Sequence, residues 1–203
     1  MTAVLFWRSR GLVWLLASVA AVGLACWAVP LGLIANPVSG MRYSLVEGVP
    51  GLGAGVLLSF LVADPMAEME GTVPRVRLVL SRLSWLALAL VGFVGAGVIG
   101  LVVRHDATIW QSVAHVRACL MGLGLGIASG SVLPRQIAWL PPVAYLVACW
   151  IGGILDVGGH AAWWAVPCYR ADSCTAAVAA VIGFMGGAVV YLWRGGWPLR
   201  AGE

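Results

Sequence analysis

Long apolar stretches, separated by short segments that hold nearly all of the charge, dominate this chain of 203 residues. A helix needs about 20 apolar residues to cross the hydrocarbon core of a bilayer, and about 17 suffice for a short span. Six stretches meet this requirement, at 11–30, 47–63, 83–103, 118–134, 137–155 and 175–193. Because lipid offers the backbone no hydrogen-bond partners, each stretch is expected to be helical. The sequence therefore predicts an all-α fold with six transmembrane helices.

The composition excludes a soluble domain. Hydrophobic residues make up 62% of the chain and charged residues only 10%, whereas soluble domains contain about 25% charged residues. The mean hydropathy is +0.97. We therefore expect a polytopic membrane protein in which residues 1–203 form one bundle without a separate soluble domain. All 12 basic residues are arginines, and this bias, with abundant Ala, Gly and Val, is typical of a GC-rich bacterial genome. The expected location is a bacterial plasma membrane.

The distribution of arginine predicts the side of the membrane on which each connector lies. With both termini in the cytoplasm, the cytoplasmic segments hold Arg8, Arg10, Arg75, Arg77, Arg82, Arg135, Arg194 and Arg200. The outer segments then hold only Arg42, Arg104, Arg117 and Arg170. The positive-inside rule thus favours cytoplasmic termini and a cytoplasmic connector at 64–82. The first apolar stretch is longer than the core of a signal peptide, so it is interpreted as a retained span.

Small residues recur at every fourth position in the last three predicted spans. These rows are Gly122, Gly126 and Gly130; Ala144, Ala148 and Gly152; and Ala179, Gly183 and Gly187. Rows of this kind allow helix backbones to approach closely in lipid. A chain this rich in Ala and Gly also produces such rows by chance. With either origin, the helices are expected to pack into one compact bundle.

Motifs typical of enzymes and of metal sites are missing from the sequence. It contains no GxSxG, HExxH or CxxC motif and no lysine-dependent phosphate loop. The three histidines, His105, His115 and His160, fall in outer connectors or at span edges, where a solvated side chain is the simplest interpretation. Arg117 likewise falls at a span end. We therefore expect a chain that is not an enzyme and that needs no cofactor, metal or nucleic acid.

The predicted outer connector between the fifth and sixth spans contains two cysteines and two adjacent tryptophans. Cys168 and Cys174 flank "YRADS", a spacing that allows a small disulfide loop in an oxidising compartment, with two free thiols as the alternative. Trp163 and Trp164 follow His160 in "GGHAAWWAVP", and aromatic rings favour the membrane interface. We expect a short re-entrant helix here that dips into the outer leaflet.

The connector "DPMAEMEGTVPRVRLVLSR" concentrates charge of both signs in a chain that is otherwise nearly uncharged. Its charged residues are Asp64, Glu68 and Glu70, followed by Arg75, Arg77 and Arg82. Asp64 is a suitable N-cap for a short helix that Gly71 ends, and Pro74 can begin a second helix leading into the third span. A membrane-surface helix would explain the arginines, but anionic lipids would repel the acids. A protein partner in the cytoplasm accounts for both.

In this connector the sequence resembles the exporter-type (type-two) permeases of ATP-binding-cassette transporters. The stretch "EMEGTVPRVRLVLSRL" contains, in the order of the family pattern, Glu68, Glu70, Gly71-Thr72, Pro74 and Ser81-Arg82. The resemblance implies six spans with both ends cytoplasmic and a cytoplasmic coupling helix between the second and third spans. It also implies re-entrant helices between the fifth and sixth spans, in the region of Trp163 and Trp164.

The same resemblance implies a permease subunit that moves its substrate outward and lacks ATPase activity of its own. Its partners would be a separate ATPase subunit and a second permease copy or a paralogue. The coupling contacts would involve Asp64, Glu68, Glu70, Arg75, Arg77 and Arg82. Two alternatives stay open. One is the substrate-binding subunit of an energy-coupling-factor vitamin transporter, with Ala17, Ala21 and Ala25 as a docking row; the other is a non-catalytic structural subunit.

Overall fold

The computed structural model describes residues 12–28, 33–35, 42–62, 75–103, 109–134, 136–153, 161–169 and 172–194. The α-helices of this described part are α2 (Leu12–Ala28), α3 (Leu45–Val62), α5 (Arg75–Val103), α6 (Ile109–Val132), α7 (Leu140–Gly152) and α8 (Cys174–Arg194). Two short antiparallel strands, β1 (Leu33–Ala35) and β2 (Arg42–Ser44), form a hairpin, and η1 (Val166–Cys168) is one turn of 3-10 helix. Apart from this hairpin the described fold is helical, which confirms the predicted all-α class.

Three of the described helices are long and apolar enough to cross a membrane. Their apolar segments are Leu78–Val103, Ile109–Val132 and Cys174–Trp193. The other three helices contain shorter apolar segments, Leu12–Ala28, Val49–Val62 and Leu140–Gly152. By length and composition the structure therefore supports a membrane protein. Of the six predicted spans, three correspond to helices long enough to cross a membrane, and the other three correspond to shorter helices.

The fifth predicted span, 137–155, is the one that the structure shortens most. Its helix α7 has 13 residues, which at 1.5 Å per residue is about 20 Å long, less than the roughly 30 Å of a hydrocarbon core. Pro141 and Pro142 are the second and third residues of α7, in its first turn. They have no N–H to donate, so they are tolerated at a helix start and not further inside. The preceding residues 136–139 form turns instead of helix.

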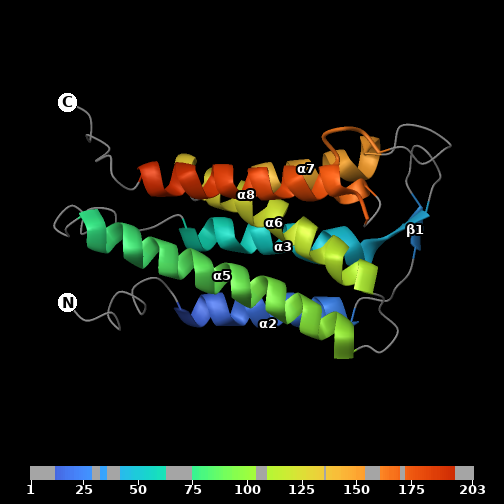
Figure 1. Cartoon of the computed structure of the whole chain (residues 1–203), viewed down its shortest axis with the longest axis horizontal. Coiled ribbons are helices and arrows are strands. Elements are labelled where there is room, and N and C mark those ends of the chain that lie inside the picture. The colour runs from blue at the N-terminus through green and yellow to red at the C-terminus, as the bar shows by residue number, and fades with distance from the viewer. Residues whose placement is uncertain are drawn as a thin grey trace.

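The helices lie side by side along one direction, with α3 and α6 in the middle (Figure 1). α7 and α8 lie on one side of this central pair, and α2 and α5 lie on the other. The first residues of α2 and α5 and the last residues of α8 are at the same end of the bundle, on the left of Figure 1. The hairpin and η1 are at the opposite end.

Glycines bring three pairs of helices into backbone contact. A Cβ added at Gly55 of α3 would fall on the backbone of Gly122 in α6, and one added at Gly187 of α8 would fall on Gly124. Between α2 and α5, a Cβ at Gly23 would come 3.2 Å from the Ala96 carbonyl oxygen. Such close approach provides van der Waals packing where lipid supplies no hydrophobic driving force.

All three glycine-mediated pairs are parallel, and in each pair one other described helix lies between the two partners in the sequence. In α3 and α6, Gly51 meets Ala118 and Ser59 meets Gly130, so residue numbers rise together along the interface. The pairs α2 with α5 and α6 with α8 follow the same rule. An up-and-down bundle, in which the chain reverses direction at each connection, produces this parallel pairing of alternate helices.

The small-residue rows behave differently in the three helices that contain them. Gly122, Gly126 and Gly130 face α3, and Gly183 and Gly187 face α6. These two rows are confirmed as sites of close helix approach. In α7, however, Ala144 and Ala148 are exposed on the outside of the bundle. For this third row the structure agrees with the alternative interpretation, that a chain rich in Ala and Gly produces such rows by chance.

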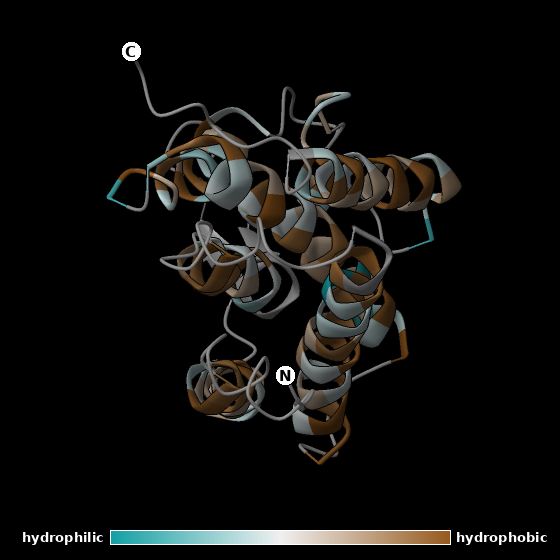
Figure 2. Cartoon of the chain, turned by 90° about the vertical axis from the view of Figure 1, so that its left-hand side faces the viewer, coloured by the Kyte–Doolittle hydropathy of each residue, from teal (hydrophilic) through white to brown (hydrophobic). Residues whose placement is uncertain are grey.

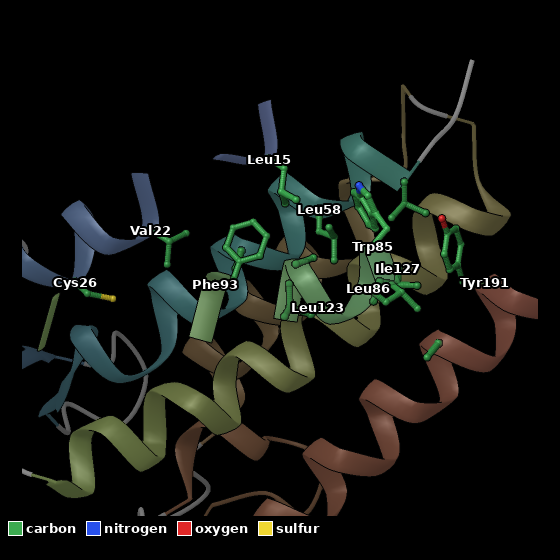
Figure 3. Packing of buried hydrophobic residues seen from close by; sticks show 14 of the residues in the cluster. Leu15, Val22, Cys26, Leu58, Trp85, Leu86, Phe93, Leu123, Ile127 and Tyr191 are labelled. Carbon is green, nitrogen blue, oxygen red and sulfur yellow. The ribbon is translucent and has the colours of Figure 1, made fainter. Parts of the chain in front are cut away.

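The main hydrophobic core runs through five of the described helices (Figure 3). Leu15 and Val22 of α2, Leu58 of α3, Phe93 of α5 and Leu123 of α6 are among its members. Large hydrophobic side chains also cover the outside: Trp14 and Val91 are each 70% exposed. Viewed along the helices in Figure 2, hydrophobic residues lie on outward as well as inward faces. Contact with lipid tails stabilises such a surface, whereas water would not.

Candidate functional site

The first turns of α5 were predicted to lead from the charged connector into the third span. The structure agrees in the backbone, because α5 begins at Arg75, directly after Pro74. Arg75 and Arg77 lie in this first part of α5. The acids Asp64, Glu68 and Glu70 lie outside the described residues. The predicted short helix that ends at Gly71 also lies outside them.

Arg82 is buried inside the bundle and is not placed to contact a partner. It is 7% exposed, and its Nη1 donates a hydrogen bond to the carbonyl oxygen of Tyr191 in α8 at 3.0 Å. Its guanidinium carbon lies 4.9 Å from the centre of the Tyr191 ring. A desolvated cation–π contact of this kind contributes about 2 kcal/mol. The predicted partner contact is therefore wrong for Arg82, because α8 covers this side chain and its role is to join α5 to α8.

The connector that was predicted to be an outer loop, residues 161–169, is fastened to α7 by Tyr145. The Tyr145 hydroxyl donates to the Trp164 carbonyl oxygen at 2.8 Å and accepts a bond from the Val166 backbone N–H at 3.2 Å. Of the two tryptophans, Trp163 is 85% exposed, while Trp164 packs against the buried cluster around Tyr145. The helical part of this loop is one 3-10 turn, η1, in the region where a short re-entrant helix was predicted. His160 lies outside the described residues.

Arg117 ties the same loop to α6. It is 3% exposed, and its Nη2 donates to the Tyr169 carbonyl oxygen at 2.6 Å. A groove of about 260 Å³ lies beside it between α6 and α8, with mainly apolar walls that include Val113, Leu120 and Val181. The prediction placed Arg117 at a span end within reach of headgroups. The structure instead buries it eight residues inside α6.

The predicted disulfide between Cys168 and Cys174 is not formed. All five cysteines lie in the described part of the chain, and all are free thiols. Cys174 is the first residue of α8 and is exposed. Cys168 turns the other way, and its thiol donates to the Cys149 carbonyl oxygen of α7 at 3.4 Å. The short spacing in sequence suggested the pairing, but the loop directs the two side chains to different neighbours.

The position of His115 differs strongly from the one predicted from the sequence. It is fully buried in α6 instead of solvated at a span edge. The Cys119 sulfur lies 3.2 Å from its Nε2, and the Cys26 sulfur of α2 lies 3.7 Å from its Nδ1. Ionisable or polar side chains inside a membrane bundle are costly and are often functional. Because Cys26 is far away in sequence, no local signal indicated this contact.

The Gly97→Ala variant tests the His115 site. A Cβ at Gly97 would fall on the His115 ring, whereas a Cβ at Gly95, two residues earlier in α5, would meet nothing within 4 Å. We expect Gly97→Ala to destabilise the chain by about 1–3 kcal/mol, as overpacking does. Gly95→Ala is the control and is expected to be stabilising by up to about 1 kcal/mol, because alanine favours a helix. Thermal midpoints in detergent measure both, and equal midpoints would contradict the position of His115.

The arrangement around His115 does not suit a metal ion. Its two ring nitrogens point in opposite directions, so the Cys26 and Cys119 sulfurs lie on different sides of the ring. One ion cannot reach a ring nitrogen and both sulfurs together. Among the described residues, no group of three or more His, Cys, Asp or Glu side chains is placed to hold a metal.

Comparison with protein-family models found no matching family, and comparisons with curated proteins and with solved structures found no significant match. The class of the protein therefore follows from its own structure. Apart from the short hairpin β1–β2, its described part is helical and has several helices long and apolar enough to cross a membrane. A buried arginine makes a cross-link near each end of this bundle: Arg82 joins α5 to α8 at one end, and Arg117 joins α6 to the loop 161–169 at the other.

Proposed function

We propose that this chain is the permease subunit of an ATP-driven exporter and that the connector 64–82 couples it to a separate ATPase. The observation that carries the proposal is the continuity of α5. This helix begins at Arg75, inside the connector, and runs without a break to Val103. Its apolar segment Leu78–Val103 has 26 residues and is the longest of the candidate spans in the described chain. A force on the connector therefore acts directly on a helix that runs along the bundle.

The contacts of α5 supply a route from the connector to other helices. Arg82 joins α5 to Tyr191 in the last turns of α8. On its other side α5 packs closely on α2, where a Cβ at Gly100 would come 2.5 Å from the Gly23 carbonyl oxygen. Helices packed this closely move as rigid elements rather than deforming continuously. Displacement of α5 is therefore expected to carry parts of α2 and α8 with it.

The proposal includes six membrane-spanning helices, with both termini and the connector 64–82 in the cytoplasm of a bacterial cell. Parallel pairing of alternate helices supports this topology, because a chain that crosses back and forth produces this pairing. The shorter helices α2, α3 and α7 pack beside longer ones. A bilayer accommodates a short apolar helix by local thinning or by flanking side chains that reach the interface.

The proposed assembly contains a second permease copy or a paralogue, together with ATPase subunits that carry the nucleotide chemistry. Two features of the sequence support a separate ATPase: the chain has no lysine and no phosphate-binding glycine loop. The acids of the connector, Asp64, Glu68 and Glu70, are proposed to contact basic residues of that partner. Arg75 and Arg77 are proposed to contact lipid headgroups or the same acids.

One observation favours a second candidate function, the substrate-binding subunit of a vitamin uptake transporter. The small-residue row on α2 was suggested as its docking surface, and Ala17 and Ala21 of that row are exposed. An exposed row of small residues would allow close approach of a helix from a scaffold subunit. The connector between α3 and α5 has no evident role in this alternative.

Identification of the proteins that co-purify with the tagged chain in mild detergent tests both functions. We expect an ATPase subunit and no larger membrane scaffold. A larger scaffold subunit together with the ATPase would favour the vitamin uptake function instead. Absence of any ATPase, from a preparation in which the chain elutes as a single folded species, would contradict both proposals.

A further inference from the structure

Cys149 and Cys168 meet in a small buried cluster between α7 and the outer loop. The cluster contains Cys149, Ala162 and Ala165, with Tyr145, Trp164 and Cys168 packed against it. The Cys168 sulfur lies 3.4 Å from the Cys149 carbonyl oxygen, and the two thiols also interact with each other. The glycine at position 153 makes room for them, because a Cβ there would come 2.5 Å from the Cys168 sulfur.

We propose that Cys149 and Cys168 form a disulfide that fastens the outer loop to α7 when the chain is exposed to an oxidising thiol–disulfide couple. The loop is already held in position by the two hydrogen bonds of the Tyr145 hydroxyl. Arg117 holds the following residue, Tyr169, from the side of α6. The two thiols are therefore kept together by contacts other than their own. This inference does not depend on the proposed exporter function.

The disulfide forms by two exchange steps with a small disulfide such as oxidised glutathione. The Cys168 thiolate attacks one sulfur of the small disulfide, whose S–S bond breaks and releases one thiol. The Cys149 thiolate then attacks the Cys168 sulfur of the mixed disulfide and releases the second small thiol. Overall, two protein thiols are oxidised to one disulfide, and one molecule of small disulfide is reduced to two thiols.

Cys168 is the better placed of the two to react first. It is partly exposed, whereas Cys149 is only 3% exposed. The pKa of the Cys168 thiol lies below its usual value, chiefly because a hydrogen bond from Cys149 stabilises the thiolate and also because the Arg117 guanidinium is near. Partial burial opposes this lowering of the pKa. A lower pKa increases the thiolate fraction available for exchange.

Tryptic mapping of the full chain distinguishes this disulfide from the alternative with Cys174. Cleavage after Arg135, Arg170 and Arg194 leaves Cys149 and Cys168 together in peptide 136–170 and places Cys174 in peptide 171–194. The purified chain is incubated with oxidised glutathione, and remaining thiols are alkylated under denaturing conditions. We expect peptide 136–170 to be lighter by two hydrogen atoms and unalkylated, with Cys174 alkylated. Alkylation of both Cys149 and Cys168, or a link between the two peptides, would overturn the proposal.

Two variants test the order of the steps. Cys174→Ser is the control and is expected to leave the internal disulfide of peptide 136–170 unchanged. In Cys149→Ser the second step is blocked, so Cys168 is expected to retain one glutathione as a mixed disulfide. Cys149→Ala provides the same test with an apolar side chain if serine disturbs the buried cluster. Absence of glutathione on Cys168 in both folded variants would contradict its role as the first thiol to react.

Discussion

Replacement of Gly55 by leucine is expected to prevent native packing of α3 against α6. A Cβ at Gly55 would fall on the backbone of Gly122, and a Cβ at Gly126 would in turn fall on Gly55. Because the obstacle on each side is backbone, no side-chain rotation can relieve it, and the helices have to separate. Overpacking in a core costs about 1–3 kcal/mol and occasionally more. We expect Gly55→Leu to reach at least the upper end of this range.

Gly53→Leu is the matched control for this prediction. Gly53 lies in the same helix, and a Cβ there would meet nothing within 4 Å. Size-exclusion chromatography after heating in mild detergent gives the thermal midpoint of each variant. At about 2–4 °C per kcal/mol for a chain of this size, a destabilisation of about 3 kcal/mol lowers the midpoint of Gly55→Leu by about 6–12 °C. If Gly55→Leu does not fold, Gly55→Ala gives the smaller shift of the same sign, and midpoints equal to the control would contradict the α3–α6 contact.

The double variant Glu68→Lys/Glu70→Lys is expected to lose its ATPase partner and its transport activity while remaining folded. Reversal of two charges places like charges against the basic surface proposed for the ATPase, which costs several kcal/mol in binding. The buried core starts further along α5, where Trp85 and Phe93 pack, so the bundle itself is expected to keep its stability. Co-purification, transport and the elution profile are compared with those of the unchanged chain.

The control for this double reversal is Asp106→Lys/Glu203→Lys, which changes the net charge by the same amount outside the connector 64–82. We expect this variant to keep its ATPase. Loss of the ATPase from both variants would show a general effect of charge. Retention of ATPase and transport by a well-folded Glu68→Lys/Glu70→Lys variant would show that the connector is not a coupling helix, and the exporter proposal would then lose its main support.

The positions of most helices could be predicted from apolar stretches because lipid leaves the backbone no alternative to internal hydrogen bonds. The bounds of α2 and α8 differ from the predicted spans by only a few residues, and α5 begins where Pro74 predicted a helix start. α6 starts earlier than predicted, at Ile109 rather than at 118. Its first turns include His115 and Arg117, polar side chains that normally mark the end of a span.

The structure shows why these two residues are inside the bundle. His115 meets Cys26, which is 89 residues away, and Arg117 meets the backbone of Tyr169, which is 52 residues away. Arg82 is likewise covered by Tyr191, 109 residues further along the chain. Partners at such separations leave no trace in local spacing. The same reason accounts for Cys168, which lies against Cys149 rather than the nearer Cys174 in sequence.

Composition and span length determined that this chain is helical and belongs in a membrane, because both follow from the solvent that a chain this apolar requires. Small residues in the later spans also predicted close helix approach. Only the tertiary structure decided which helices approach: α6 turns Gly122 and Gly126 to α3 and turns Gly124 to α8. Similar small residues occur in every helix, so no single row specifies its partner. The pairing of helices is set when several interfaces fit at the same time. α6 takes part in two of these interfaces, one with α3 and one with α8.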